Sequence, residues 1–172
     1  MPDVYVAAGG NVEPLRYLQR ALELLELEFG PLTVSPAYRN PAVGFSGEDF
    51  INLVVRFGAT ADVASVREKL QWIEARCERL RAAPKWGPRT MDLDILLYGE
   101  MVCDQPGLVL PRPDLARRAY MLKPMADIAP DLVHPRLGRT MRELWDGFAP
   151  RDRMETVTIP RCGRRQPPRS GQ

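Results

Sequence analysis

The amino-acid sequence predicts an α+β fold, in which a four-stranded antiparallel sheet carries two long helices packed on one face. Segments with strand or helix periodicity follow one another in the order strand, helix, strand, strand, helix, strand. This order is the ferredoxin-like βαββαβ pattern, which leaves the second face of the sheet for additional elements or a ligand. With 172 residues, the chain is long enough to bury the core of one such domain.

The first strand and the first helix are predicted within residues 4–29. Residues 4–8 are mostly apolar, and two glycines then mark a turn that ends the strand. Pro14 suits the first turn of a helix, and Gly30 followed by a proline stops it. Between them, apolar side chains recur at helical spacing, namely Leu15, Leu18, Leu22, Leu25 and Phe29.

The second half of the pattern ends in the fourth strand. Residues 33–38 and 50–57 are the next two predicted strands, with a proline- and glycine-containing loop between them. A second helix begins at about Asp62, and a loop over residues 81–88 follows it. Residues 91–98 are the fourth predicted strand. The buried stripe of the second helix is formed by Val63, Val66, Leu70, Ile73, Cys77 and Leu80.

Beyond the fourth strand the pattern is irregular. Residues 108–113 are predicted as extended, residues 114–128 as short helices, and residues 141–145 as one more short helix. The side chains expected to turn inward from residues 114–128 are Tyr120, Leu122 and Met125. We therefore assign residues 1–149 to a single domain with C-terminal additions, and residues 150–172 to a basic tail that is predicted to be disordered.

Composition and charge exclude several classes of protein. Hydrophobic residues make up 45% of the chain and charged residues 27%, as in soluble globular domains. The net charge of +2 argues against a dedicated nucleic-acid binder. The tail, with six arginines and two acidic residues, has a net charge of +4, so the folded body is slightly acidic, at −2. No stretch approaches the ~20 apolar residues of a membrane helix. Three cysteines without metal-type spacing, and no signal peptide, predict free thiols in a reducing cytoplasm. We expect the protein to be a monomer.

Two aspartates within the fourth strand are the strongest indication of function. Asp92 and Asp94 lie two residues apart, so both carboxylates leave the same face of the strand while Leu93 and Ile95 point toward a core. Adjacent carboxylates repel each other unless a cation neutralises them. The simpler alternative is two surface aspartates paired with arginines. Because aspartate disfavours strands, we instead expect a Mg²⁺ site that binds a polyphosphate.

A group of cations precedes these aspartates. Arg79, Arg81 and Lys85 can be explained as the basic end of a helix. That explanation does not cover Arg89, which stands immediately before the strand. Arginine binds phosphate oxygens through two donors and stays charged. The loop with Trp86 at its centre is therefore expected to close over a bound nucleotide.

Other chemistry-bearing patterns are weak or absent. Asn52 lies in an apolar strand, where its amide needs partners and can read a flat heterocycle. Aromatic residues such as Phe50 and Tyr120 are more often structural than functional. His134 is the only histidine, and we expect a structural role for it. The sequence contains no P-loop and no credible nucleophile–histidine arrangement.

Several segments, in the right order, resemble the 6-hydroxymethyl-7,8-dihydropterin pyrophosphokinase family of folate biosynthesis, over roughly residues 3–148. The most specific is Lys-Trp-Gly-Pro-Arg-Thr-Met-Asp-Leu-Asp-Ile-Leu-Leu-Tyr-Gly at residues 85–99. The others are Tyr38-Arg39-Asn40-Pro41, Phe50-Ile51-Asn52, Arg118-Ala119-Tyr120-Met121-Leu122 and Ile128-Ala129-Pro130.

The resemblance implies an ATP-dependent diphosphokinase that transfers pyrophosphate to the hydroxymethyl group of the reduced pterin and releases AMP. Two Mg²⁺ ions on the triphosphate of ATP would be held by Asp92 and Asp94. The implied catalytic residues are Arg79, Arg81, Arg89, Asp92 and Asp94. The implied ATP-binding residues are Gln71, Glu74, Arg81, Trp86, Arg89, Ile95, Arg112 and Arg118. The implied pterin-binding residues are Asn40, Pro41, Val43, Phe50, Asn52, Trp86 and Tyr120.

The chain departs from the family pattern at two positions. The family usually has histidine between two prolines where this chain has Arg112 between Pro111 and Pro113. That histidine contacts an ATP phosphate, so we expect Arg112 to keep a cation there and to alter nucleotide affinity without abolishing activity. Phe50 stands where the family often has tyrosine.

Two alternative functions are compatible with parts of the sequence. A metal-dependent nucleotidyltransferase also uses paired aspartates on a strand, but it releases pyrophosphate and not AMP. A nucleic-acid-binding module would use the arginine-rich tail, and its binding would depend steeply on salt. The aspartate pair and the acidic body argue against the second alternative. We name no general base, because positioning and charge stabilisation carry most of the catalysis of phosphoryl transfer.

Overall fold

The computed structural model of the chain describes residues 1–42, 47–78, 90–151 and 153–160. Its strands are β1 (Asp3–Gly10), β2 (Thr33–Val34), β3 (Ala37–Asn40), β4 (Phe50–Gly58), β5 (Asp92–Tyr98), β6 (Cys103–Gln105), β7 (Leu108–Leu110) and β8 (Glu155–Val157). Its helices are α1 (Pro14–Phe29), α2 (Val63–Arg76), α3 (Ala119–Ile128) and α4 (Met141–Asp146), with a short 3₁₀ helix at Pro113–Ala116.

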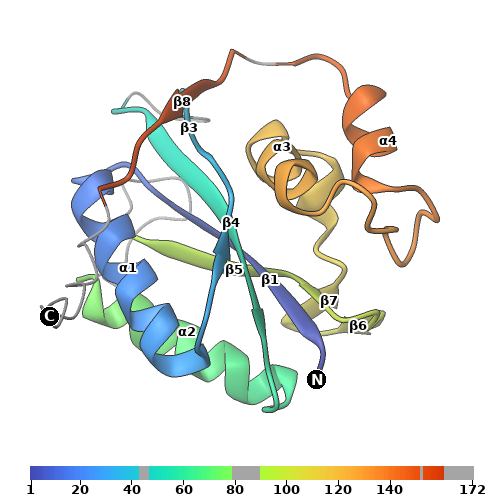
Figure 1. Cartoon of the computed structure of the whole chain (residues 1–172), viewed down its shortest axis with the longest axis horizontal. Helices are drawn as coiled ribbons and strands as arrows, with labels where there is room; N and C mark the ends of the chain where they lie inside the picture. Colours follow the sequence, from blue (N-terminus) through green and yellow to red (C-terminus); the bar gives the residue numbers. More distant parts are fainter. Residues whose placement is uncertain (43–46, 79–89, 152, 161–172) are drawn as a thin grey trace, which may run out of the picture.

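The main sheet is antiparallel, and its strands lie in the order β5-β1-β4-β3-β8, with β2 paired to β4. Helices α1 and α2 lie on one face of this sheet, whereas α3 and α4 cover the other, so the molecule has three layers (Figure 1). The inner strand order and the two helices on one face confirm the predicted ferredoxin-like α+β fold. The face covered by α3 and α4 is the one that the βαββαβ pattern left open for additional elements.

Alternation along the strands divides the core into two parts. In β1, Val4, Val6 and Ala8 pack against α1 and α2, because successive side chains of a strand point to opposite faces. Tyr5 and Ala7 pack on the other side, with the buried apolar residues of α3 and α4. Of the stripe predicted for the second helix, four residues are buried, namely Val66, Leu70, Ile73 and Cys77. Val63 is only partly buried against the same core, and Leu80 lies outside the described residues.

The second predicted strand, over residues 33–38, was wrong in detail. It is two short strands, β2 and β3, and β3 extends to Asn40. Pro36 interrupts the ladder because proline has no N–H group to donate. Ser35 bridges the break, since its backbone N–H donates to the Val54 carbonyl at 2.9 Å and its hydroxyl accepts from the Val54 N–H at 2.8 Å.

The predicted disordered tail also needs correction at residues 155–157. These residues form β8, which pairs antiparallel with β3 through Ala37, Tyr38 and Arg39. In Figure 1 the chain crosses from α4 to reach β3. Three residues are too few to show a periodicity, so the partner strand and not the local sequence determines this strand. Residues 161–172, which include the third cysteine, lie outside the described residues.

A short hairpin was missed in the sequence. Residues 108–113 were predicted only as an extended segment, with no partner strand. In the structure, β7 pairs antiparallel with β6. Pro106 and Gly107 form the turn between them, and Gly107 has φ +79°, a backbone conformation that glycine adopts readily. The Pro-Gly dipeptide was the available sequence signal for this hairpin. Its position beside β5 matters for the site described below.

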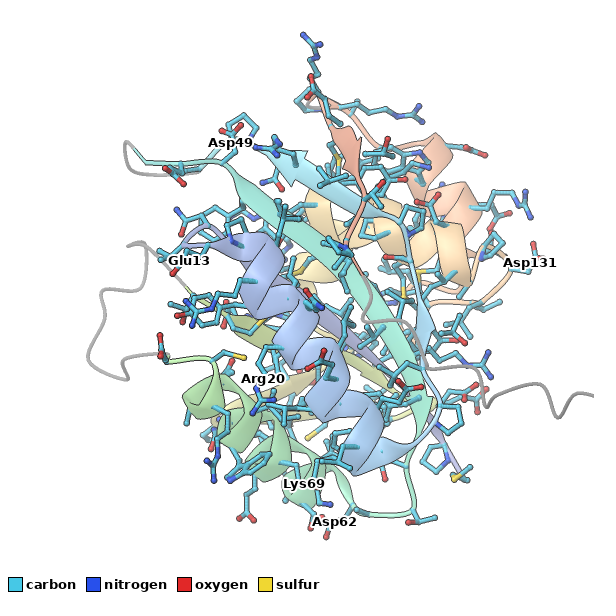
Figure 2. All side chains as sticks on the ribbon, turned by 60° about the vertical axis from the view of Figure 1, so that its left-hand side comes forward. Glu13, Arg20, Asp49, Asp62, Lys69 and Asp131 are labelled. Atoms are coloured by element: carbon cyan, nitrogen blue, oxygen red, sulfur yellow. The ribbon has the colours of Figure 1, made fainter. Side chains whose placement is uncertain are left out.

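Helices α1 and α2 are joined by an ion pair between the last turn of α1 and the middle of α2. Lys69 of α2 lies 2.8 Å from Glu28 of α1, and Figure 2 shows the labelled Lys69 between the two helices. Asp62 caps α2, because its side chain accepts from the Ser65 N–H at 2.8 Å. In the same view Asp131 projects from the opposite layer. No helix within the described ranges is both long and apolar enough to span a membrane.

Candidate active site

A groove of about 510 Å³ runs along the outer side of β5. Helix α2 forms one wall, β5 forms the floor, and the β6–β7 hairpin with the segment that follows it forms the other wall. The groove brings together six residues that the sequence predicted for ATP or metal binding, namely Gln71, Glu74, Asp92, Asp94, Ile95 and Arg112.

Asp92 and Asp94 occupy the same face of β5, as their spacing predicted. They pair across the ladder with Gly9 and Ala7 of β1, and Ala7 packs on the α3 side of the sheet. Both aspartates are only partly buried, so their carboxylates line the groove. The intervening Leu93 is buried on the opposite face.

Arg112 lies against this aspartate pair. Its guanidinium Nη1 is 3.2 Å from Asp94 Oδ1, and its Nε is 3.6 Å from Asp114 Oδ2. The backbone of Arg112 is fixed to the strand, because its N–H donates to the Leu96 carbonyl at 2.9 Å. The chain therefore places a permanent cation on a carboxylate that the sequence assigned to a metal.

Glu74 and Gln71 reach the groove from one face of α2. Glu74 Oε1 accepts a hydrogen bond from the Leu93 N–H at 2.8 Å, which joins the helix directly to β5. Gln71 is exposed along the same wall. The contact of Glu74 with the strand is structural, so this residue positions the wall of the groove in addition to its predicted nearness to the nucleotide.

The amide predicted to read a heterocycle has defined partners. Asn52 is buried on β4, and its Nδ2 donates to Asn40 Oδ1 on β3 at 2.6 Å. Asn40 Nδ2 in turn donates to the Pro41 carbonyl at 3.3 Å. Gly9 lies opposite Asn52 on β1, and a Cβ atom on Gly9 would stand 2.0 Å from Asn52 Oδ1. The glycine is therefore needed for the amide to lie where it does.

The two predicted aromatic residues, Phe50 and Tyr120, come from different elements on the same side of the sheet as Asn52. Phe50 begins β4 and pairs in register with Asn40. Tyr120 lies in the first turn of α3, on the face of the sheet that also carries Asp94 and Asn52. Burial raises the pKa of the Tyr120 phenol, the nearby Arg118 guanidinium opposes this rise, and Asp94 adds to it.

The structure describes only part of the predicted site. The predicted residues outside the described ranges are Val43, Arg79, Arg81, Trp86 and Arg89. The loop that was expected to close over the nucleotide lies among them. The described residues nevertheless place the ends of this segment, Glu78 and Thr90, beside α1 and at the start of β5 respectively.

Several residues that line the groove or contact its lining were missed in the sequence. Arg67 lies one helical turn before Gln71 on α2 and lines the same wall, so the helical spacing could have identified it. Val109 and Leu110 of β7 form the opposite wall and were missed together with the hairpin. Asp114 carries no motif, and only the folded structure shows that it contacts Arg112.

The aspartate pair fits a magnesium ion that retains other ligands. Within the described part of the chain, no cluster of three or more histidine, cysteine, aspartate or glutamate side chains could hold a metal ion. Mg²⁺ commonly binds one or two carboxylates and completes its coordination with water and phosphate oxygens. The guanidinium on Asp94 shows that this carboxylate accepts a cation in the groove.

Comparisons with known proteins agree on one family. Residues 5–130 match the 7,8-dihydro-6-hydroxymethylpterin-pyrophosphokinase (HPPK) family. A 2-amino-4-hydroxy-6-hydroxymethyldihydropteridine pyrophosphokinase from Pseudomonas aeruginosa is 41% identical over 145 residues, which cover 82% of this chain and 88% of the relative. The enzyme of the same name from Synechocystis is 39% identical over 142 residues, with 81% and 72% covered.

A similar fold is found in solved structures of a longer protein. The crystal structure of Plasmodium falciparum HPPK-DHPS wild type with pteroate aligns with a TM-score of 0.69 at 14% sequence identity. The alignment covers 84% of this chain and 42% of the Plasmodium chain. At this identity the likeness concerns the fold alone.

Proposed function

The chain belongs to the 7,8-dihydro-6-hydroxymethylpterin-pyrophosphokinase family, and from this membership we propose how its groove performs the family's reaction. The protein is an ATP-dependent diphosphokinase of folate biosynthesis. It transfers pyrophosphate from ATP to the hydroxymethyl group of 6-hydroxymethyl-7,8-dihydropterin and releases AMP.

Asp92 and Asp94 are proposed to hold two Mg²⁺ ions against the triphosphate of ATP. Their shared face on β5 and their position in the groove support this role. The ions would neutralise the charge of the phosphate oxygens and draw electron density from the β-phosphorus. The two aspartates would fix where the triphosphate lies relative to the pterin.

The nucleotide is proposed to bind in the groove between α2 and the β6–β7 hairpin. Leu70, Ile95 and Val109 provide apolar surface there, and Gln71 provides an amide. Arg118 would approach the phosphates from the α3 side, on which Tyr120 lies near Asp94. The remaining proposed phosphate and nucleotide contacts come from the segment between Glu78 and Thr90, namely Arg79, Arg81, Trp86 and Arg89.

The pterin is proposed to lie beside Asn52, between Phe50 and Tyr120. Asn40, Pro41 and Val43 would complete the edge of its site. The fixed amide pair of Asn40 and Asn52 supports this assignment, because a buried amide held by a neighbour presents its remaining polar atoms in one orientation. The face that carries Asn52 also carries Asp92 and Asp94, so pterin and triphosphate would meet on one side of the sheet.

Positioning accounts for the chemistry of the site. The pterin hydroxyl attacks the β-phosphorus in line, the bond from this phosphorus to the α-phosphate oxygen breaks, and AMP carries that oxygen away. Fixed side chains around both substrates supply the orientation and the charge stabilisation. The observation that carries the proposal is the presence of both aspartates, Arg112 and the α2 residues around one groove.

Replacement of the aspartates tests the proposed roles. Asp92→Asn and Asp94→Asn keep the side-chain shape but remove the charge, so turnover with ATP, Mg²⁺ and the reduced pterin should fall on the order of 100-fold or more. Activity is measured as AMP formed, which also separates this reaction from that of a nucleotidyltransferase.

The matched control is Asp131→Asn. Asp131 is an exposed aspartate that pairs with Arg142 at 3.0 Å in a different layer of the molecule. Its variant should retain the turnover of the unmodified protein. Near-normal turnover in either groove variant, with a folded protein, would refute the metal-binding role.

A further inference from the structure

We propose that Arg112 is an internal counter-ion that occupies Asp94 until a nucleotide arrives, and that it thereby couples metal binding to nucleotide binding. On this view Arg112 does more than place a positive charge near a phosphate. It prevents the aspartate pair from binding a divalent cation tightly in the absence of ATP. The inference rests on the metal-binding role proposed above for Asp92 and Asp94.

The contacts of Arg112 support an exchange of partners. Its Nη1 lies 3.2 Å from Asp94 Oδ1, at the position of a direct ion pair. The second carboxylate, Asp114, lies at 3.6 Å from Nε, which is too far for a good hydrogen bond. Asp94 and Asp114 compete for the one guanidinium of Arg112. A divalent cation that coordinated Asp94 would have to displace this guanidinium.

The guanidinium is incompletely satisfied in this position. Arg112 Nε is buried, and it finds no hydrogen-bond acceptor within the described part of the chain. A buried donor without an acceptor is destabilising, because it has lost its hydrogen bond to water. The backbone of Arg112 is held by the Leu96 carbonyl, so a change of partner requires movement of the side chain alone. A phosphate oxygen offers a charged acceptor that would satisfy such a donor.

The balance of charge gives the direction of the coupling. Without nucleotide, Arg112 partly neutralises Asp94, and Asp94 is further shielded because its side chain is only 23% exposed. A metal ion alone must break the ion pair and leave the guanidinium beside a dication, with Asp114 as its remaining acidic neighbour. With ATP present, the triphosphate accepts the guanidinium and the ion pair between Arg112 and Asp94 no longer opposes the metal. Because such coupling is reciprocal, the metal must strengthen nucleotide binding by the same factor.

The test measures the binding of manganese(II), as a paramagnetic stand-in for Mg²⁺, to the full chain by electron paramagnetic resonance. Binding is measured with the metal alone and with α,β-methylene-ATP, which cannot transfer pyrophosphate. The variants are Arg112→Gln, which removes the charge, and Arg112→Lys, which retains it. The control is Arg142→Gln, which removes an arginine from the exposed pair with Asp131.

Arg112→Gln is expected to tighten the binding of the metal alone by about fivefold, the equivalent of one partly exposed ion pair. The gain in metal affinity on adding the nucleotide analogue should shrink by a similar factor. Arg112→Lys should behave like the unmodified protein, and so should Arg142→Gln. If Arg112 had only a structural role, the variant that loses the charge and the variant that keeps it would not differ in this way in their affinity for the metal.

Two results would overturn the inference, and they are distinguishable. If Arg112→Gln leaves the metal-alone affinity unchanged while Asp94→Asn weakens metal binding with the analogue, the metal site stands and the counter-ion role is wrong. If Asp94→Asn does not weaken metal binding with the analogue, the proposed metal site itself is wrong.

Discussion

Asn52 occupies a position that only a glycine at residue 9 allows. The two residues face each other across β1 and β4, and the Asn52 carboxamide lies over the backbone of Gly9. In this position the amide can donate to Asn40 at 2.6 Å. The conformational freedom of Gly9 is unimportant here; what matters is the absence of a side chain.

Gly9→Ala should therefore weaken binding of the pterin more than binding of ATP. The new Cβ atom would displace the amide from its partner, and the loss of one oriented hydrogen bond is expected to raise KM for the pterin about tenfold. Steady-state kinetics with each substrate varied separately measure the two effects.

Gly147→Ala is the control for this substitution, because the nearest atom to a Cβ there is 3.3 Å away, at the end of the Arg139 side chain. An equal rise in KM for ATP and pterin in Gly9→Ala would contradict the predicted role of the amide.

His134 illustrates a residue whose structural role was predicted and is supported by its contacts. It is buried, and its Nδ1 accepts from the backbone N–H groups of Arg136 and Leu137 at 3.2 and 3.3 Å. Burial lowers the pKa of the imidazole below its usual 6.5, and the charge of Arg136 lowers it further. A protonated Nδ1 could not accept these hydrogen bonds, so the neutral form is the one that stabilises the turn.

The free energy of unfolding should consequently fall as the pH drops below about 6.5. In that range the unfolded chain takes up a proton on His134 that the folded chain resists, because the pKa is lower in the folded state. Denaturant titrations at pH 7.5 and 5.5 measure the loss. His134→Asn retains an acceptor atom but cannot titrate, so the loss between the two pH values should be smaller. An equal loss in both proteins would show that His134 is not responsible.

At the scale of elements, the break between β2 and β3 is stabilised by one side chain. The Ser35 hydroxyl accepts a hydrogen bond from the Val54 N–H. In an uninterrupted ladder this N–H would donate to a backbone carbonyl. The Ser35 hydroxyl also donates to the Pro36 carbonyl at 2.8 Å. A single buried side chain thus takes over a backbone contact that the proline interrupts.

Ser35→Ala should lower the free energy of unfolding by about 1–3 kcal/mol, because the buried Val54 N–H loses its acceptor. Chemical denaturation measures this quantity. Ser65→Ala is the control, since the Ser65 backbone N–H that donates to Asp62 at the start of α2 is retained in this variant. A loss in Ser35→Ala no larger than in the control would contradict the prediction.

Strong periodicity made most elements predictable. Helix α1 begins at Pro14 and ends at Phe29, as the apolar spacing and the following Gly30 predicted. The fourth strand is found over Asp92–Tyr98, and the last short helix over Met141–Asp146. The elements that were missed or altered are short ones, β6 and β8 above all, whose pairing partners lie elsewhere in the chain. Their formation depends on tertiary contacts that no local pattern contains.

Of the candidate site, only the features that follow from local sequence could be predicted. The face shared by Asp92 and Asp94 follows directly from strand geometry, and the groove contains them both. The ion pair between Arg112 and Asp94 was not predicted, because the two residues are brought together by the return of the chain along β5. From the family resemblance, Arg112 was expected to bind an ATP phosphate. The structure adds that Arg112 contacts Asp94.

At the scale of the whole molecule, β8 returns the chain from the α3 layer to the sheet. It pairs with β3 next to Asn40, and Val157 and Ile159 pack against the core that α1 and α2 cover. The C-terminal segment therefore supports the strand that carries part of the proposed pterin site.

Two truncations separate the contribution of β8 from that of the residues after it. A chain that ends at residue 150 loses two partly buried apolar side chains, or about 2 kcal/mol, and should melt about 4–8 °C lower than the full chain. A chain that ends at residue 160 retains β8 and should melt with the full chain. Thermal unfolding followed by circular dichroism measures both, and equal melting temperatures for the two truncations would contradict a stabilising role for β8.

The contacts of Glu74 and Arg112 with the backbone of β5 have a consequence for how the protein behaves in a crowded solution. β5 is an outermost strand of the sheet, and such a strand can recruit a strand from another molecule and start aggregation. Here the Leu93 N–H is taken by Glu74 and the Leu96 carbonyl by Arg112. The residues that build the groove thus also withhold two backbone groups from intermolecular pairing, which lets the strand that bears the aspartates stay accessible to substrates without becoming a template for aggregates.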